Sequence, residues 1–166
     1  MPAKNPKEIF VLLLSHVRQG TERTTKILEE LSEIAQHPEI RDALEARAFV
    51  SQRTLEKLDE AFKLIGEKPV SVSGRLHDVF VEDFRRELAE IQSPEAKRLF
   101  VLAKANQLIH LRIGEYVALV AAADVSGHYG VGVLLESCLA DTLAFVERTK
   151  RLVRNIIEAR VAAKSA

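Results

Sequence analysis

Small polar side chains interrupt four long apolar repeats of the sequence, and they are the residues best placed to do chemistry. The group comprises alcohols, one glycine, one amide and one imidazole: Gly20, Thr21, Thr24, Ser51, Thr54, Asn106, His110 and Thr142. Such groups destabilise a helical core unless they form hydrogen bonds, although a helical hydroxyl can also donate to a preceding carbonyl. The pattern leaves two interpretations open: a core layer that satisfies its own hydrogen bonds, or a modified binding cavity.

Metal chemistry in a helical bundle would need more acids than this pattern offers. A di-metal site takes a Glu from each of two helices and a Glu-x-x-His pair from each of the other two. The sequence contains no Glu-x-x-His, and the nearest acid–histidine pair, Glu33 and His37, lies beside Pro38. No phosphate-binding loop, dinucleotide fingerprint or nucleophile motif occurs either. The residues therefore predict no metal, no cofactor and no catalytic group.

Prolines and glycines divide the chain into helical segments. The residue before a proline avoids helical geometry, Gly66 suits a helix C-terminus, and Ser93 before Pro94 suits an N-terminus. The expected helices cover about residues 6–36, 38–65, 75–91, 94–124 and 131–162 of one domain, 1–166. Short first and last loops and one long connection with a short helix predict two antiparallel hairpins joined by a crossover. This all-α wiring is that of a ferritin-like four-helix bundle.

Heptad spacing predicts which face of each long helix is buried. The first begins at Leu13 and the third contains Leu99, Leu102, Asn106, Ile109, Ile113, Tyr116 and Val120. The last contains Val131, Leu135, Cys138, Thr142, Phe145, Thr149, Leu152 and Ile156. Apolar residues outside these faces predict the contact surface of a homodimer: Phe10, Leu12, Leu14, Phe100 and Val101.

The amino-acid composition narrows the classes of binding partner and the cellular compartment that we expect for this protein. Lys plus Arg and Asp plus Glu number 24 each, and this zero net charge argues against a nucleic-acid binder. A single cysteine, Cys138, excludes an internal disulfide and favours a reducing compartment, so we expect a cytoplasmic protein. No apolar run approaches the ~18–20 residues that cross a bilayer.

The end of the second helix carries a family resemblance. Residues 55–69 read LEKLDEAFKLIGEKP, which is similar to the pattern R-L-E-x-x-F-x-L-L-G-E-K-P of the bacterial YciF/YciE-like ferritin-like proteins, a domain of unknown function. The resemblance extends from about Ile9 to Ile157 and includes the short helix and the spacing of His110 and Tyr116. It implies a ferritin-like fold and dimerisation.

The metal-site motifs of that family are missing here. Where the family shows H-x-x-E-T-x-x-H on the second helix, this chain has Arg47, Val50, Ser51 and Thr54. Where it shows E-H-Y-E on the third, the chain reads 109–112 IHLR. The resemblance thus implies degenerate former metal-site positions at Thr21, Val50, Thr54, Ile109, Arg112, Thr142 and Val146. The remaining candidates for a polar core are Glu22, Ser51, Asn106, His110 and Asp141.

Arg112 places a fixed positive charge where the resemblance implies an acid. One hypothesis is that its guanidinium partly replaces a metal cation and pairs with Asp141 or Glu22. The alternative is that Arg112 extends to the surface along its apolar stem.

Three functional interpretations follow. The first is a non-catalytic structural or stress-associated bundle that has lost its di-metal site, with the stress association implied by the resemblance alone. The second is a di-iron or di-manganese oxidoreductase or iron-handling protein with a site rebuilt from Glu22, His110 and Asp141. The third is a small-molecule pocket lined by the polar residues of the four helices: Thr21, Thr54, His110 and Thr142.

Overall fold

Five α-helices account for most of the residues that the structure describes. The computed structural model describes residues 5–165, and the side chains of residues 5–159. The helices are α1 (Pro6–Ala35), α2 (Pro38–Leu64), α3 (Arg75–Glu90), α4 (Pro94–Val125) and α5 (Tyr129–Ser165). Their ends lie within a few residues of the predicted ones, and the largest differences are at α5, which begins before residue 131 and continues past 162.

Capping residues explain several of the boundaries. The side chains of Asn5 and Ser93 accept hydrogen bonds from the third backbone N–H of α1 and α4, and a proline follows each as the first helical residue. At the other end of α1, Gln36 adopts a left-handed conformation with φ 48° and lets the chain reverse into α2.

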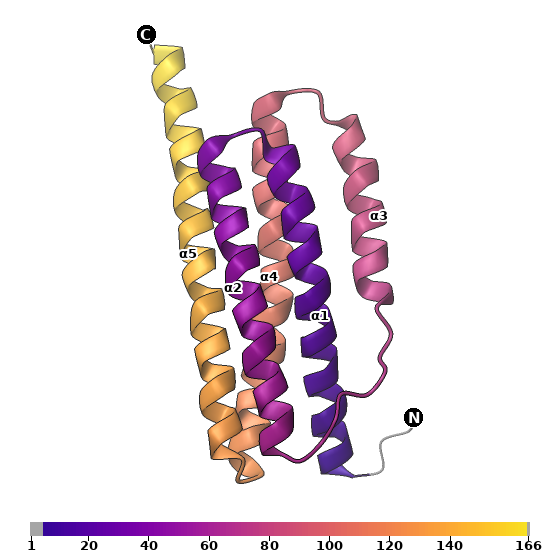
Figure 1. Ribbon diagram of the computed structural model, residues 1–166. Helices are drawn as coiled ribbons and strands as arrows, with labels where there is room; N and C mark the ends of the chain where they lie inside the picture. Colours follow the sequence, from indigo (N-terminus) through magenta and orange to yellow (C-terminus); the bar gives the residue numbers. More distant parts are fainter. Residues whose placement is uncertain (1–4, 166) are drawn as a thin grey trace.

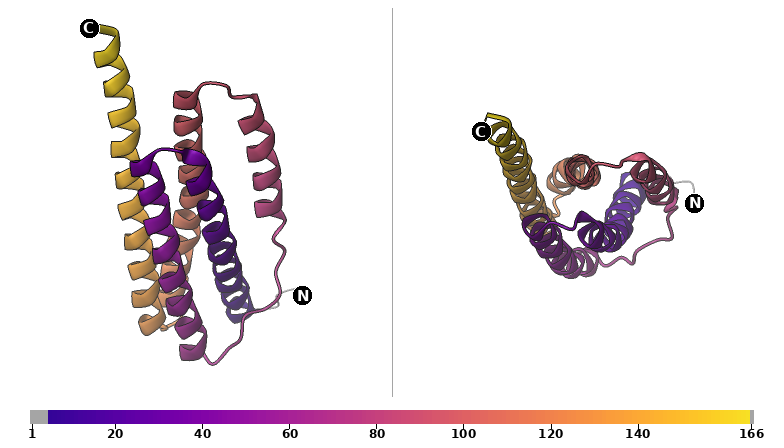
Figure 2. Two further views of the ribbon diagram at one scale, coloured as in Figure 1. Left: turned by 45° about the horizontal axis from the view of Figure 1, so that its top comes forward. Right: turned by 90° about the horizontal axis from the view of Figure 1, so that it is seen from above.

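The four long helices form an antiparallel bundle of the ferritin-like kind (Figure 1). Helix α1 packs against α2 and α4, and α5 packs against the same two neighbours, so α1 and α5 lie at opposite corners (Figure 2). Helix α3 stands outside this bundle beside α1 and α4, and α5 extends beyond the end of the others (Figure 1). The predicted all-α fold with one crossover is confirmed.

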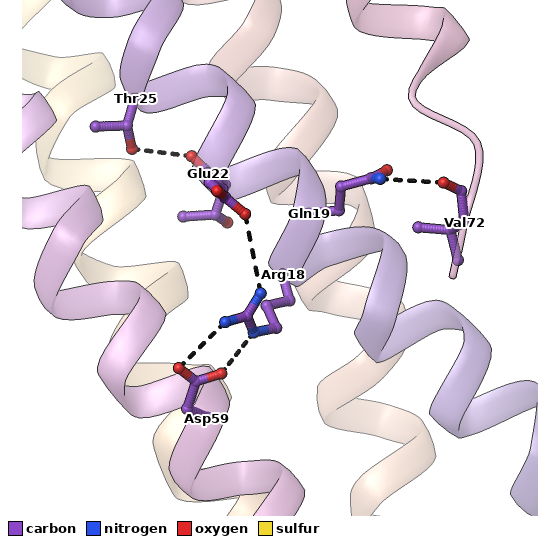
Figure 3. A network of polar contacts seen from close by, with 7 residues as sticks. Arg18, Gln19, Glu22, Thr25, Asp59 and Val72 are labelled. Carbon is purple, nitrogen blue, oxygen red and sulfur yellow. Dashed lines mark hydrogen bonds and ion pairs between the residues drawn. The ribbon is translucent and has the colours of Figure 1, made fainter. Parts of the chain in front are cut away.

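The crossover between α2 and α4 is attached to one face of α1. Ser15, Gln19 and Arg23, each four residues apart, contact the connecting segment in turn. The Ser15 hydroxyl accepts a hydrogen bond from the Val70 N–H at 3.0 Å. The Gln19 amide donates one to the Val72 carbonyl at 3.0 Å (Figure 3). These polar contacts fix the connection although α3 itself packs lightly.

The core consists of two apolar clusters with a polar layer between them. The α1–α2-turn cluster contains residues such as Leu28, Leu31, Leu44 and Leu102. The α4–α5-turn cluster, at the other end, contains residues such as Leu14, Leu58, Leu119 and Leu135. The polar layer between them is composed of buried side chains from all four helices: Thr21, Thr24, Arg47, Ser51, Thr54, Arg112 and Thr142.

The buried faces of α1 and α4 agree with the predicted ones only in part. Leu13 is exposed, and the buried residues of α4 follow the alternating 3-4 spacing Leu102, Ala105, Ile109, Arg112, Tyr116, Leu119 and Ala123. The predicted α4 face is therefore confirmed at Leu102, Ile109 and Tyr116. At the alternate positions it is one residue too late, and the predicted Asn106, Ile113 and Val120 are only half-buried. For α5 the predicted face is confirmed from Val131 to Leu152.

The predicted dimer face is wrong except at Leu12, which is half-buried. Phe10, Leu14 and Val101 lie in the core, and Phe100 stacks on Phe84 of α3 with ring centres 5.6 Å apart. The physical reason is that a bundle helix buries more than its heptad positions, because it contacts two neighbours.

Helix α5 contradicts the expectation that no apolar run is long enough to cross a membrane. Its segment Tyr129–Ala159 is long and apolar enough to cross a membrane by length and composition alone. The expectation that no run reaches this length is therefore wrong. A core helix passes the same test, and α5 packs against α2 and α4 here, so this property is weak evidence for a membrane span.

Candidate functional site

Two buried arginines occupy the polar layer, one from α2 and one from α4. Arg47 is 4% exposed and Arg112 is 3% exposed. Each stands among apolar core residues of its own helix, Leu44 and Ala48 around Arg47, Ile109 and Tyr116 around Arg112. Because these neighbours fix the helix faces, both guanidinium groups must enter the bundle rather than reach solvent. The alternative that Arg112 extends to the surface is therefore wrong.

Arg112 forms an ion pair inside its own helix. Its Nη1 lies 2.7 Å from Oε2 of Glu115, although neither atom has hydrogen-bond geometry there and Nε has no partner. Its other side faces α1 at Gly20, where an added Cβ would overlap the guanidinium. Burial lowers the pKa of Arg112 and raises that of Glu115, and the attraction between the two opposes both changes.

Arg47 has far fewer partners for its charge. One nitrogen, Nη2, donates to the Thr142 hydroxyl of α5 at 3.2 Å, and that hydroxyl donates onward to the Cys138 carbonyl at 2.6 Å. Nε and Nη1 have no hydrogen-bond partner. Burial lowers the pKa of Arg47, but an arginine stays charged in a protein. Within residues 5–159, no carboxylate forms an ion pair with it.

The groups beside the two guanidiniums are neutral. Burial raises the pKa of the Tyr116 phenol, and nearby Cys138 raises it further, whereas Thr21, Arg47 and Arg112 lower it. Burial likewise raises the pKa of the Cys138 thiol to about 11. Both therefore keep their protons at neutral pH. The hydroxyls of Tyr116 and Thr21 lack a hydrogen bond of standard geometry.

Other hydroxyls of the predicted polar positions satisfy themselves. Thr54 donates to the Val50 carbonyl one turn earlier at 3.0 Å. Thr149 donates to the Asn106 side chain of α4 at 2.7 Å, which gives half-buried Asn106 a partner across the α4–α5 interface. For Thr54, Thr142 and Asn106 the structure agrees with a self-satisfied layer. Ser51 is buried beside them, Ile109 is fully buried, and Val50 and Val146 are half-buried.

Three predicted core groups lie at the surface instead. Glu22 is exposed and faces Arg18, which in turn forms its stronger ion pair with Asp59 of α2 at 2.5 Å (Figure 3). Asp141 is half-exposed and pairs with Lys57 at 3.0 Å. The hypothesis that Arg112 pairs with either acid is wrong, because a carboxylate one helical turn away reaches it first.

His110 is also exposed and contacts the Asn106 carbonyl at 2.8 Å. It follows buried Ile109, and a step of about 100° around the helix places His110 on the exposed face of α4. His110 therefore cannot share a pocket with buried Thr21, Thr54 and Thr142, and the predicted four-residue pocket is wrong.

Buried His77 connects the layer to α3. Its Nε2 lies 3.5 Å from the Thr24 hydroxyl of α1. Burial and the nearby charges of Arg112 and Arg23 lower the pKa of His77 to about 4, against a small opposing effect of Asp78. His77 is therefore neutral at physiological pH.

The layer does not fit a divalent metal ion. A metal requires several anionic or neutral ligand atoms, and here two cations face one carboxylate. In the described part of the chain, no three His, Cys, Asp or Glu side chains come close enough together to hold a metal ion. The arrangement can instead attract negative charge and donate hydrogen bonds.

Sequence reasoning missed the importance of Arg47 and of Glu115. A signal for Arg47 existed, since it continues the buried spacing of Ala43, Leu44, Ala48 and Ser51. For Glu115 the signal was its place three residues after Arg112, which is a favourable spacing for a helical ion pair.

Comparisons with known proteins place the chain among uncharacterised relatives. The family described as Domain of unknown function (DUF892) matches residues 5–162. No curated protein matches the sequence.

Three solved structures share the fold. YcfI, a putative structural protein from Rhodopseudomonas palustris, is 22% identical, with a TM-score of 0.85 over 90% of this chain and 95% of its own. The E. coli stress protein YciF is 20% identical, with a TM-score of 0.87 over 94% and 99%. A Xanthomonas campestris pv. campestris protein is 19% identical, with a TM-score of 0.71 over 94% and 99%. These identities support a shared fold and nothing finer.

Proposed function

Since the chain belongs to the DUF892 family of domains of unknown function, we propose that it is a non-catalytic, ferritin-like bundle with a structural or stress-associated role, and that it has lost its di-metal site. Two proteins of the same fold, described as a putative structural protein and a stress protein, support the role. The observation that carries the proposal is the pair of buried guanidiniums, Arg47 and Arg112, in the polar layer.

Two fixed cations change what the bundle centre can do. A di-metal centre brings two cations to a cage of carboxylates and histidines. Here the cations are covalent parts of α2 and α4, and the only carboxylate that pairs with either within the described residues is Glu115. A metal cation added from solvent would meet net positive charge, so the layer disfavours metal uptake.

The alternative, an oxidoreductase with a rebuilt metal site, loses its candidate ligands. Glu22, His110 and Asp141 are on three helices but point to the surface, and each already has a partner there. This geometry gives the alternative no supporting observation.

Elemental analysis tests the proposal directly. We expect protein purified without chelators to hold iron and manganese well below one ion per chain, and we expect Arg112→Met to hold no more. The control is His110→Ala, which removes the only histidine among the alternative's ligands. Stoichiometric iron or manganese in the unaltered protein that is lost in His110→Ala would overturn the proposal.

Three further parts of the proposal concern the setting of the protein. Zero net charge supports a protein that does not bind nucleic acid. The single, buried Cys138 supports a cytoplasmic location. Exposed apolar side chains such as Phe49 and Leu143 support a homodimer. Light scattering of the purified protein gives the oligomeric state, and a monomer at micromolar concentration would contradict the last point.

A further inference from the structure

The charges inside the bundle do not balance. Arg47 and Arg112 contribute two positive charges to the polar layer, and Glu115 contributes one negative charge that pairs with Arg112. The carboxylate of Asp141 attracts Arg47 through space, but its own contact is with Lys57. A buried charge without a counter-charge is costly, and the protein supplies no direct one for Arg47.

The unused hydrogen-bonding atoms around Arg47 are mostly donors. They include Nε and Nη1 of Arg47, Nε of Arg112 and the hydroxyls of Tyr116 and Thr21. Arg47 of α2 contacts Thr142 of α5, and Arg112 of α4 lies against Gly20 of α1, so both guanidiniums enter the polar layer of the bundle. Both also lower the pKa of the buried Tyr116 phenol, which lies in the same layer. The Tyr116 phenol stays protonated, so its hydroxyl can donate a hydrogen bond. The region therefore offers a surplus of N–H and O–H groups and a net positive charge.

We propose that this region binds one small monovalent inorganic anion of the halide kind, held by the Arg47 guanidinium and the Tyr116 hydroxyl. The anion supplies the missing counter-charge and accepts the unused hydrogen bonds. The proposal goes beyond the structural role described above, because it depends on the isolated charge of Arg47 and not on whether the bundle ever held a metal.

Close packing limits the size of the anion. Arg112 fills the space beside Gly20 so completely that even an added methyl group would overlap it. A halide is a small spherical acceptor that needs little more room than a water molecule. Phosphate, or an organic acid, is larger and would need more room than the packed layer leaves beside Gly20.

Thermal unfolding in matched salts tests the binding. The full-length protein is dialysed into sodium gluconate and titrated with sodium chloride at constant ionic strength. At a hundredfold excess over its dissociation constant, a ligand specific for the folded state raises the midpoint by about 5–10 °C in a chain of this size. We expect this rise in the unaltered protein and in Arg85→Met, whose ion pair with Glu30 is exposed. We expect no rise in Arg47→Met.

Bromide replaces chloride in a second measurement that needs no variant. Crystals grown in sodium bromide should show an anomalous scattering peak beside Arg47 and Tyr116. A peak there supports the proposal even when Arg47→Met fails to fold. Absence of the peak, with an ordered water in its place, overturns the proposal, and so does an equal chloride response in Arg47→Met and Arg85→Met. A metal found in elemental analysis bears on the proposed function and leaves these outcomes unchanged.

Discussion

The two apolar clusters and the polar layer between them belong to the same four helices but obey different rules. In the clusters, fully buried leucines such as Leu31, Leu58 and Leu135 contribute stability through the surface they remove from water. In the layer, helix packing forces Arg47 and Arg112 away from water, which costs free energy unless partners compensate. The comparison shows that burial stabilises the fold in the apolar clusters but destabilises it in the polar layer, unless each buried polar group has a partner.

The largest expected effect comes from breaking the ion pair between Arg112 and Glu115 in the polar layer. Glu115→Gln leaves buried Arg112 without a counter-charge and should lower the free energy of unfolding by about 3–5 kcal/mol. Arg112→Met should also destabilise, because it leaves the half-buried carboxyl of Glu115 unpaired. The double variant should recover most of the loss. Urea denaturation of all four proteins measures this, and strictly additive losses would show that the two residues do not interact.

Two truncations of similar size should differ between a cluster and the layer. Leu102→Ala leaves a cavity in the α1–α2-turn cluster and should cost about 2–5 kcal/mol. Arg47→Met removes an unpaired buried charge and should be neutral or stabilise by about 1–3 kcal/mol in halide-free buffer. Denaturation in gluconate gives both values. If Arg47→Met cost as much as Leu102→Ala there, the charge of Arg47 would have a partner that this account lacks.

His77 should make stability depend on pH through its contact with the layer. Its pKa is lowered to about 4 in the folded protein, against about 6.5 when unfolded. Between about pH 6.5 and 4, His77 is protonated in the unfolded chain but neutral in the folded protein. The contribution of His77 to the free energy of unfolding is therefore complete above about pH 6.5 and decreases as the pH falls towards 4. The loss should reach about 2–3 kcal/mol. Melting curves of His77→Gln should lack this part of the pH dependence, and an unchanged profile would contradict it.

The smallest expected effects come from two matched glycines. Gly20→Ala pushes a methyl group into the Arg112 guanidinium and should destabilise by about 1–2 kcal/mol, despite the better helix propensity of alanine. Gly114→Ala, on the exposed face of α4 with open space around it, should stabilise by about 0.5–1 kcal/mol. Thermal melts of the pair decide whether the layer is as tightly packed as the clusters, and equal shifts of the same sign would show that it is not.

The same comparison explains what the sequence could predict. Helix ends follow from Pro38, Gly66 and Pro94, which act locally, and the buried face of α5 follows from regular apolar spacing. The unusual position of Arg112 was also visible in the sequence. These features depend on one helix at a time.

The partners within the layer could not be predicted in the same way. Whether Arg112 meets Glu115, Asp141 or Glu22 depends on small rotations of α4 against α1 and α5, and the predicted α4 face was off by one residue at that point. The isolation of Arg47 depends on what the other three helices fail to supply, which no single-helix pattern contains. The burial of His77 likewise needs α3 to be placed against α1.

Arginine side-chain resonances test the central claim most directly, since that claim is two ordered, buried guanidiniums in the middle of the bundle. In protein labelled with ¹⁵N-arginine, we expect two Nε–H signals to be protected from exchange with solvent, one lost in Arg47→Met and the other in Arg112→Met. Arg148, which is exposed on α5, supplies the unprotected reference. If the Arg47 and Arg112 signals exchanged as fast as that of Arg148, the layer would be open to water and the account would be wrong.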